Sequence, residues 1–180
     1  VATGKTRELL TPAQLLQGAE EQLAPEEKAR RERMRVSSRG ITSYSLSKDG
    51  ATLLVPLSGK LYLVDRASAK AREIGQGSGF PIDPRLSDDG SKIGCVRGGD
   101  LCVIDVASGK ELKLTSHTGD SVEYGTAEFV AAEEMDRREG YWFSPDASRI
   151  LFTVVDTSAL ERFTIADPVN PDRPANTWAY

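Results

Sequence analysis

Two adjacent carboxylates, Glu133 and Glu134, are the residues whose types and spacing most directly suggest chemistry. Neighbouring side chains point to opposite faces of a strand, whereas at a helical turn they diverge by only about 100°. Two carboxylates held together repel one another, and a cation between them relieves the repulsion. The pair is therefore a candidate site for a cation. The structural alternative is that both residues occupy the first turn of a helix, where the helix dipole alone favours them.

The rest of the chain offers little that could catalyse a reaction. A serine nucleophile of the α/β-hydrolase type sits in Gly-x-Ser-x-Gly, and the nearest match, residues 75–79, has Gly77 at its centre. His117 is the single histidine and lies in a polar loop, which favours a surface turn. One histidine and two cysteines are too few for a zinc site. We therefore expect no catalytic residue, no metal and no cofactor in this chain.

Composition excludes two classes of partner. The formal net charge is -4, whereas a nucleic-acid footprint requires a basic surface. No stretch approaches the roughly 18 consecutive apolar residues that indicate a membrane span. With 39% hydrophobic and 28% charged residues, the chain has the composition of an ordinary folded protein. We expect neither nucleic acid nor membrane as a partner.

Two cysteines, Cys95 and Cys102, flank a predicted hairpin turn at Gly98 and Gly99. Counting outward from the turn places them opposite each other in a hydrogen-bonded pair, where the Cα atoms are farther apart than in the neighbouring pair. Disulfide geometry is demanding. This arrangement favours two free thiols, and it leaves the redox compartment undecided.

A 40-residue repeat is the strongest internal signal. Its landmarks are residues 46–50, which recur as 86–90, residues 61–65, which recur as 101–105, and residues 67–70, which recur as 107–110. A period of about 40, with short strands between turns, is typical of propeller blades. The strands expected are 52–56, 61–64 and 71–74 in the first unit, 92–96, 101–104 and 111–114 in the second, and 149–155 and 162–166 in the third.

The predicted fold class is all-β, a partial β-propeller with four-stranded blades of about 40 residues and short helical insertions. Two blades are expected over residues 41–75 and 81–115, and an incomplete blade over residues 121–180. Residues 1–10 are expected to supply the last strand of a preceding blade. Because both ends fall inside blades, we interpret the chain as a fragment of a longer protein.

Two segments interrupt the repeat. Residues 11–35 are expected to be helical, with one helix over Gln14–Gln22 after the capping pair at Thr11, and a second from Pro25 to Arg35. Residues 126–139 form the second interruption, which lengthens the third unit by about 17 residues relative to the 40-residue period. This second insertion carries the two glutamates.

The insertion resembles the double-glutamate segment of dipeptidyl peptidase IV-type enzymes. In this sequence the segment runs from Glu133 to Trp142, with Asp136, Arg137, Gly140 and Tyr141 between them, and leads into Ser-Pro-Asp. The pattern is similar to that of the bacterial branch and of the cytosolic animal branch. The flanking units and the basic helix at residues 26–35 extend the resemblance over most of the chain. One departure is Phe143, where a second tryptophan is expected.

The resemblance implies a role for the two glutamates. In that family such a pair binds the free α-ammonium of the substrate, so Glu133 and Glu134 would recognise a peptide with a free N-terminus. Their fixed distance from a catalytic serine would cause release of X-Pro or X-Ala dipeptides. The serine would lie in a catalytic hydrolase domain of the same parent chain, absent here. A bacterial protein, either periplasmic or cytoplasmic, and a homo-oligomer are also expected.

The resemblance also implies an arginine that positions the substrate backbone. No matched motif places it, so the candidates stay open, and each is more commonly a solvated helix charge. They are Arg30, Arg31, Arg137 and Arg138.

Two other interpretations remain. A non-catalytic propeller scaffold needs only the repeat, because many unrelated propellers share it. A propeller of an acylaminoacyl peptidase or oligopeptidase relative has the same plan but requires no free amine. The paired carboxylates argue against both alternatives.

Overall fold

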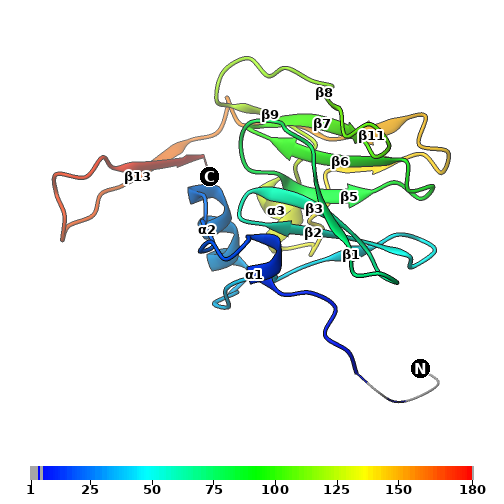
Figure 1. Ribbon diagram of the computed structural model, residues 1–180. Coiled ribbons are helices and arrows are strands. Elements are labelled where there is room, and N and C mark those ends of the chain that lie inside the picture. The colour runs from blue at the N-terminus through cyan, green and yellow to red at the C-terminus, as the bar shows by residue number, and fades with distance from the viewer. Residues whose placement is uncertain (1–3, 5, 180) are drawn as a thin grey trace.

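Two four-stranded antiparallel sheets form the body of the molecule, one for each of the first two repeats (Figure 1). The computed structural model describes residue 4 and residues 6–179. The six strands predicted in these repeats are confirmed, with ends within one residue of the prediction. The first sheet contains β1 (Ser45–Leu46), β2 (Thr52–Leu57), β3 (Lys60–Asp65) and β4 (Ala71–Ile74), and the second contains β5 (Ile82–Leu86), β6 (Lys92–Arg97), β7 (Asp100–Asp105) and β8 (Glu111–Lys113).

Both faces of the central strands β2, β3, β6 and β7 are buried, whereas β4 and β8 are largely exposed. Leu54 on β2 belongs to a core between the two sheets, with Ile93 and Cys95 on β6. Leu53 and Val55 belong to a second core on the opposite face, which the N-terminal helical segment covers. Burial on both faces explains why these strands are almost continuously apolar rather than alternating. Face-to-face stacking of four-stranded sheets is the blade arrangement of a β-propeller, and the fold is part of one.

The two cysteines are free thiols, as predicted. Cys95 and Cys102 are opposite one another in the β6–β7 register, and both side chains lie in the core between the sheets. Burial raises the pKa of the Cys95 thiol to about 12. The two cysteines are therefore small apolar core residues rather than a reactive site.

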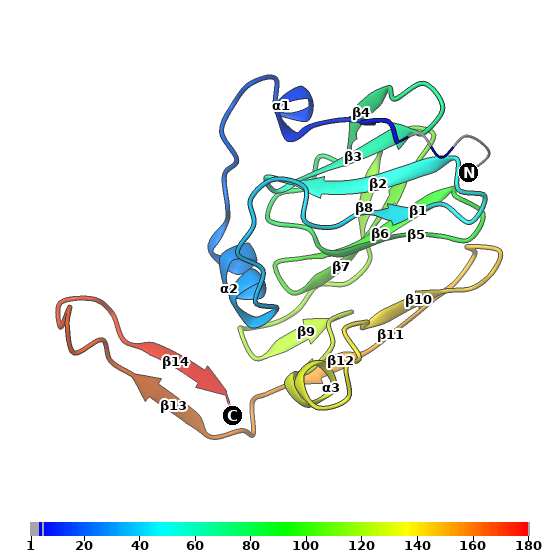
Figure 2. The ribbon, with the colours of Figure 1, turned by 90° about the horizontal axis from the view of Figure 1, so that it is seen from below.

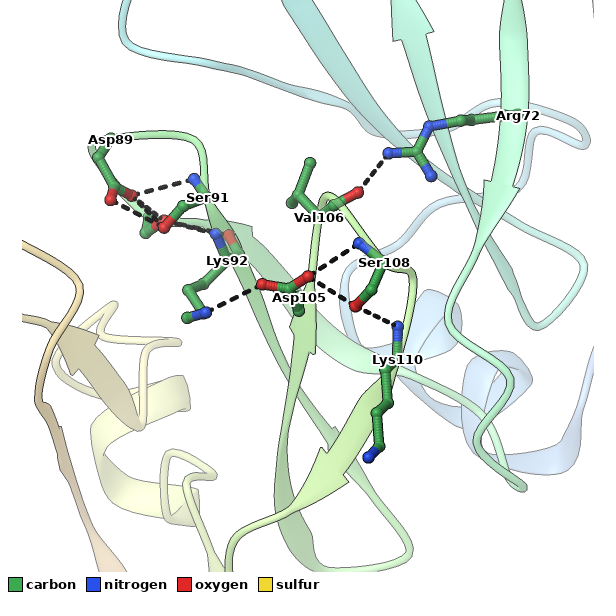
Figure 3. Close-up of polar contacts among 9 residues, drawn as sticks. Arg72, Asp89, Ser91, Lys92, Asp105, Val106, Ser108 and Lys110 are labelled. Atoms are coloured by element: carbon green, nitrogen blue, oxygen red, sulfur yellow. Dashed lines mark hydrogen bonds and ion pairs between the residues drawn. The ribbon is translucent and has the colours of Figure 1, made fainter.

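Each blade is closed by two turns in which an aspartate accepts hydrogen bonds from residues just after it (Figure 3). Asp89 accepts from the backbone N–H of Ser91 at 3.0 Å. Asp105 accepts from the Ser108 N–H at 2.8 Å and from its hydroxyl at 2.6 Å. These bonds from Ser108 hold the pKa of Asp105 down, at about 2. The recurrence of such turns at Asp49, Asp65 and Asp146 accounts for the repeated sequence landmarks.

The third unit is split by its insertion. Its elements are β9 (Val122–Tyr124), α3 (Phe129–Glu133), β10 (Tyr141–Phe143), β11 (Ile150–Phe152) and β12 (Val154–Asp156). β12 pairs with β9, and β11 pairs with β10. The prediction of one strand over 149–155 was therefore wrong at Thr153, because the strand changes partner there. Tyr141 is buried against Val96 and Leu101, which packs this unit onto the second sheet (Figure 2).

The first helical segment differs from its prediction. α1 spans only Pro12–Leu15, capped by the Thr11 side chain in a capping box with Gln14. The expected helix to Gln22 was wrong because Gln17 and Gly18 have left-handed φ values of 52° and 83°. α2 spans Pro25–Arg33, close to the predicted basic helix.

Two described segments near the ends of the chain, residues 6–10 and a hairpin over residues 162–179, lie outside the two four-stranded sheets. The predicted first strand, within residues 1–10, falls partly on residues 1–3 and 5, outside the described residues, and residues 4 and 6–10 form no strand. Near the other end, β13 (Arg162–Ile165) pairs with β14 (Asn176–Ala179) as a hairpin that projects away from the sheets in both views (Figures 1 and 2).

Candidate functional site

The insertion leaves and rejoins the third unit at a single point. The Gly125 N–H donates to the Thr153 carbonyl at 2.9 Å, and the Thr153 N–H donates to the Gly140 carbonyl at 2.8 Å. The Thr153 hydroxyl also donates to the Thr126 carbonyl at 2.6 Å. A Cβ on Gly140 would lie 2.3 Å from the Thr126 carbonyl carbon. The two ends of the insertion are therefore held against one another, and only glycine fits at residue 140.

A short helix inside the insertion carries the glutamate pair. Glu128 is the N-cap of α3, and its carboxylate accepts from the N–H groups of Val130 and Ala131, both at 2.7 Å. Glu133 is the last helical residue and Glu134 is the C-cap. The alternative of acidic residues in a first turn was therefore wrong for this pair. The negative end of the helix dipole disfavours carboxylates there, so helix stability gives no reason for them.

The other acidic side chains of the insertion have partners. Besides the capping residue Glu128, Asp136 lies 3.4 Å from the Arg138 guanidinium, and Glu139 pairs with Arg85 at 2.5 Å. Glu133 and Glu134 are both exposed. Within residue 4 and residues 6–179, neither carboxylate has a hydrogen bond or an ion pair. Adjacent, exposed and unpaired, the two carboxylates are available to a cationic group from outside the chain.

The candidate arginines have different surroundings. Arg31 is 6% exposed and pairs with Glu27 at 2.6 Å and with Glu21 at 2.7 Å, which makes it a structural residue that fastens α2. Arg30 also pairs with Glu27, at 2.6 Å, but its side chain remains 29% exposed. Arg138 lies on the insertion beside Asp136, with its side chain 52% exposed.

Arg137 connects α3 to the C-terminal end of the insertion. Its backbone N–H donates to the Ala131 carbonyl at 2.8 Å, and its guanidinium donates to the Glu139 carbonyl at 2.5 Å. The guanidinium carbon lies 5.9 Å from the Trp142 ring centroid, a cation–π distance. Trp142 is half-buried. Arg137 therefore stabilises the turn that carries the glutamates.

The remaining candidates have structural roles. His117 lies in the loop after β8, where its side chain is partly buried and its Nδ1 lies 2.8 Å from Asp100. Asp100 is buried, which would raise its pKa, but bonds from Lys113 and His117 hold the value at about 2. In the loop between blades, the Gly77 N–H donates to Glu111 at 3.0 Å. Within the described residues, no group of three or more histidine, cysteine, aspartate or glutamate side chains is arranged to hold a metal ion.

None of the three helices formed by the described residues is long and apolar enough to cross a lipid bilayer. The longest, α2, contains nine residues.

The family model of the dipeptidyl peptidase IV N-terminal region matches residues 47–180. The chain belongs to this family. The match includes the second blade, all of the first blade except β1, and the whole insertion, so it covers the glutamate pair and the strands that support it.

Individual dipeptidyl peptidases are similar over most of this chain. Human dipeptidyl peptidase 8 is 27% identical over 181 residues, covering 86% of this chain and 20% of that protein. Mouse dipeptidyl peptidase 8 is 25% identical over 190 residues, with the same coverage. The chain thus spans about a fifth of the length of these curated relatives.

A solved structure confirms the fold of this dipeptidyl peptidase IV N-terminal region. The crystal structure of Porphyromonas gingivalis dipeptidyl peptidase 4 superposes with a TM-score of 0.68 at 20% sequence identity. The superposition covers 80% of this chain and 22% of that one. At this identity the likeness establishes the partial β-propeller and leaves the roles of individual residues to the chemistry of the site.

Sequence reasoning missed the residues that connect the insertion to the second blade, namely Asp83 and Arg85. They lie more than 50 positions before Glu139, and the repeat gives them no special place. The one available signal was Pro84 inside a strand, because proline within a strand often marks an irregularity.

Proposed function

We propose that this chain is the propeller part of a serine exopeptidase that recognises the free N-terminus of a peptide and gates access to the active site. Glu133 and Glu134 bind the α-ammonium group. The catalytic hydrolase domain belongs to the same parent chain, and the parent releases N-terminal X-Pro or X-Ala dipeptides.

The observation that carries this proposal is the pair of exposed carboxylates, which have no partner among the described residues, in an insertion whose two ends are held together. An ammonium group offers three N–H donors, and charge-assisted bonds to carboxylates are among the strongest hydrogen bonds in proteins. A rigid amine site sets the distance from the N-terminus to the scissile bond, which favours removal of a unit of fixed length. Membership of a dipeptidyl peptidase family supports a unit of two residues.

Other features of the parent stay predictions. These are a serine nucleophile, a preference for proline or alanine at the second position, bacterial origin and self-association.

Digestion of an unmodified peptide with proline at positions two and four tests the proposed function. The full-length protein is expected to release two dipeptides in succession, as followed by mass spectrometry. The N-acetylated form of the same peptide is the control and is expected to stay intact, because it lacks the ammonium group that the carboxylates bind. Internal cleavage would point instead to an endopeptidase, and no cleavage at all would point to a binding scaffold.

A further inference from the structure

The first strand of the second blade is distorted where it faces the insertion. The β5–β6 register shifts between Ile82 and Arg85, and Asp83 has a left-handed φ of 46°. Aspartate tolerates this conformation better than most residues, yet it remains unfavourable. Bulges of this kind redirect side chains and are frequent beside active sites.

The distortion turns the Asp83 carbonyl toward the end of the insertion. The Tyr141 hydroxyl donates to that carbonyl at 2.5 Å, and Tyr141 is only 1% exposed. Its ring lies so close to β6 that a Cβ on Gly94 would come within 2.5 Å of the ring. The residue directly after Gly140 is thus anchored in the neighbouring blade.

The carboxylate of the same aspartate begins a chain of ionic contacts. Arg85 Nε donates to Asp83 Oδ1 at 2.9 Å, and Arg85 Nη1 donates to Glu139 Oε1 at 2.5 Å. Glu139 Oε2 accepts from Trp142 Nε1 at 2.9 Å. The hydrogen bond from Arg85, more than that from Trp142, lowers the pKa of Glu139.

Asp83 is in an unfavourable environment. Its Oδ2 atom is buried and has no hydrogen-bond partner among the residues that the structure describes, and burial raises the pKa of this carboxyl although Arg85 is adjacent. A left-handed residue and an unsatisfied buried oxygen both disfavour the folded state. Both features occur at the residue that holds Arg85 and Tyr141.

These contacts continue to the glutamate turn. Glu139 is joined through its carbonyl to the Arg137 guanidinium, and the Arg137 N–H bonds to the Ala131 carbonyl inside α3. Glu133 ends that helix. A continuous series of contacts therefore links β5 of the second blade to the turn that carries the carboxylates.

We propose that Asp83 and Arg85 are positioning residues that hold the turn carrying Glu133 and Glu134 in a fixed position relative to the propeller. The amine-binding part of this inference rests on the proposed function. The two residues act through Glu139 and Tyr141 rather than by contact with substrate. They fix the C-terminal end of the insertion, while Thr153 fixes its base.

A double-mutant cycle in the full-length enzyme tests the inference. Arg85→Met is made in the wild type and in Glu133→Gln/Glu134→Gln, and KM and kcat are measured with Gly-Pro-nitroanilide. The matched control is Arg72→Met, which removes an arginine on β4 whose guanidinium bonds the Val106 carbonyl of the second blade (Figure 3). Arg85→Lys serves as the conservative variant. Lysine retains the positive charge beside Glu139, but it lacks the two separate nitrogens with which Arg85 contacts Asp83 and Glu139.

In the wild-type background, Arg85→Met is expected to raise KM about tenfold with kcat within about twofold, because a displaced binding group weakens substrate binding. In the glutamine background it should add no further loss, because the residue acts through the carboxylates. Arg85→Lys should recover part of the loss, and Arg72→Met should leave KM unchanged. An equal rise in KM in both backgrounds, or no rise in the wild type, would overturn the positioning role.

Hydrogen exchange separates this inference from the proposed function. Arg85→Met should accelerate exchange across residues 126–139, whereas Arg72→Met should not. If the glutamine variant leaves KM unchanged, the amine-binding function fails. Faster exchange in Arg85→Met would in that case still support the positioning role of Asp83 and Arg85, and unchanged exchange would refute that role.

Discussion

If the proposed function holds, replacing Glu133 and Glu134 together by glutamine is expected to lower kcat/KM of the full-length protein for Gly-Pro-nitroanilide by roughly a hundredfold or more. Glutamine keeps the shape of each side chain but removes its charge. A hydrogen bond to a charged group contributes about 1.5–3 kcal/mol, and about 1.4 kcal/mol corresponds to a factor of ten. Steady-state kinetics on the purified variants measures the loss.

A neighbouring carboxylate provides the control. Asp136→Asn removes one negative charge from the same insertion, from a side chain that is 90% exposed beside Arg138. Its effect on kcat/KM should stay within about threefold, because a solvated charge at the surface is screened. If Asp136→Asn costs as much as the double glutamine variant, the insertion acts through its overall charge and the specific pair has no special role.

The second large effect is expected from Gly140→Ala. The new Cβ would lie 2.3–2.4 Å from backbone atoms of Gly125 and Thr126, and backbone yields less readily than a flexible side chain. Overpacking of this kind costs about 3 kcal/mol. Because Gly125 and Gly140 both bond to Thr153, exchange at the Gly125 and Thr153 amides should accelerate about a hundredfold, as measured by mass spectrometry.

Gly119→Ala is the matched control for this substitution. Gly119 has a left-handed φ of 79°, but a Cβ there meets no atom within 4 Å. It should therefore show only the cost of an unfavourable backbone conformation, about 1 kcal/mol, without opening the base of the insertion. Equal exchange at Gly125 and Thr153 in both variants would mean that the close approach at Gly140 is not essential.

The blades could be predicted closely from the sequence because their signals are local. The turns at Asp89 and Asp105 depend on side chains within three positions. Strands between such turns have little freedom in register, and the six predicted strands of the first two blades end within one residue of the prediction.

Helix boundaries were less predictable. The sequence marked the start of α1 at Thr11, but the helix ended before Gln17, where a non-glycine residue adopts a left-handed conformation. In the insertion, a helical segment was predicted within residues 126–139, and α3 lies there. The cap proved to be Glu128, so the pair came to lie at the C-terminal end of α3. One or two residues decide where a short helix ends, and several different residues can serve as its cap.

The contacts that hold the candidate site in place could not be predicted, because they join segments that are distant in the sequence. The break between β11 and β12 at Thr153 arises from strands on either side of the insertion. The pairing of Arg85 with Glu139 spans 54 positions. Apart from Pro84 inside β5, which marks an irregular strand, the sequence contains no local signal for these contacts, so the folded arrangement is needed to reveal them.

The most direct test of the central claim removes the positive charge from the substrate. We would measure kcat/KM of the wild-type full-length enzyme for Gly-Pro-nitroanilide and for its N-acetylated form, beside Glu133→Gln/Glu134→Gln. The wild type is expected to prefer the free amine by roughly a hundredfold or more, and the double variant to lose that preference. Equal cleavage of both substrates by the wild type would contradict amine recognition by Glu133 and Glu134.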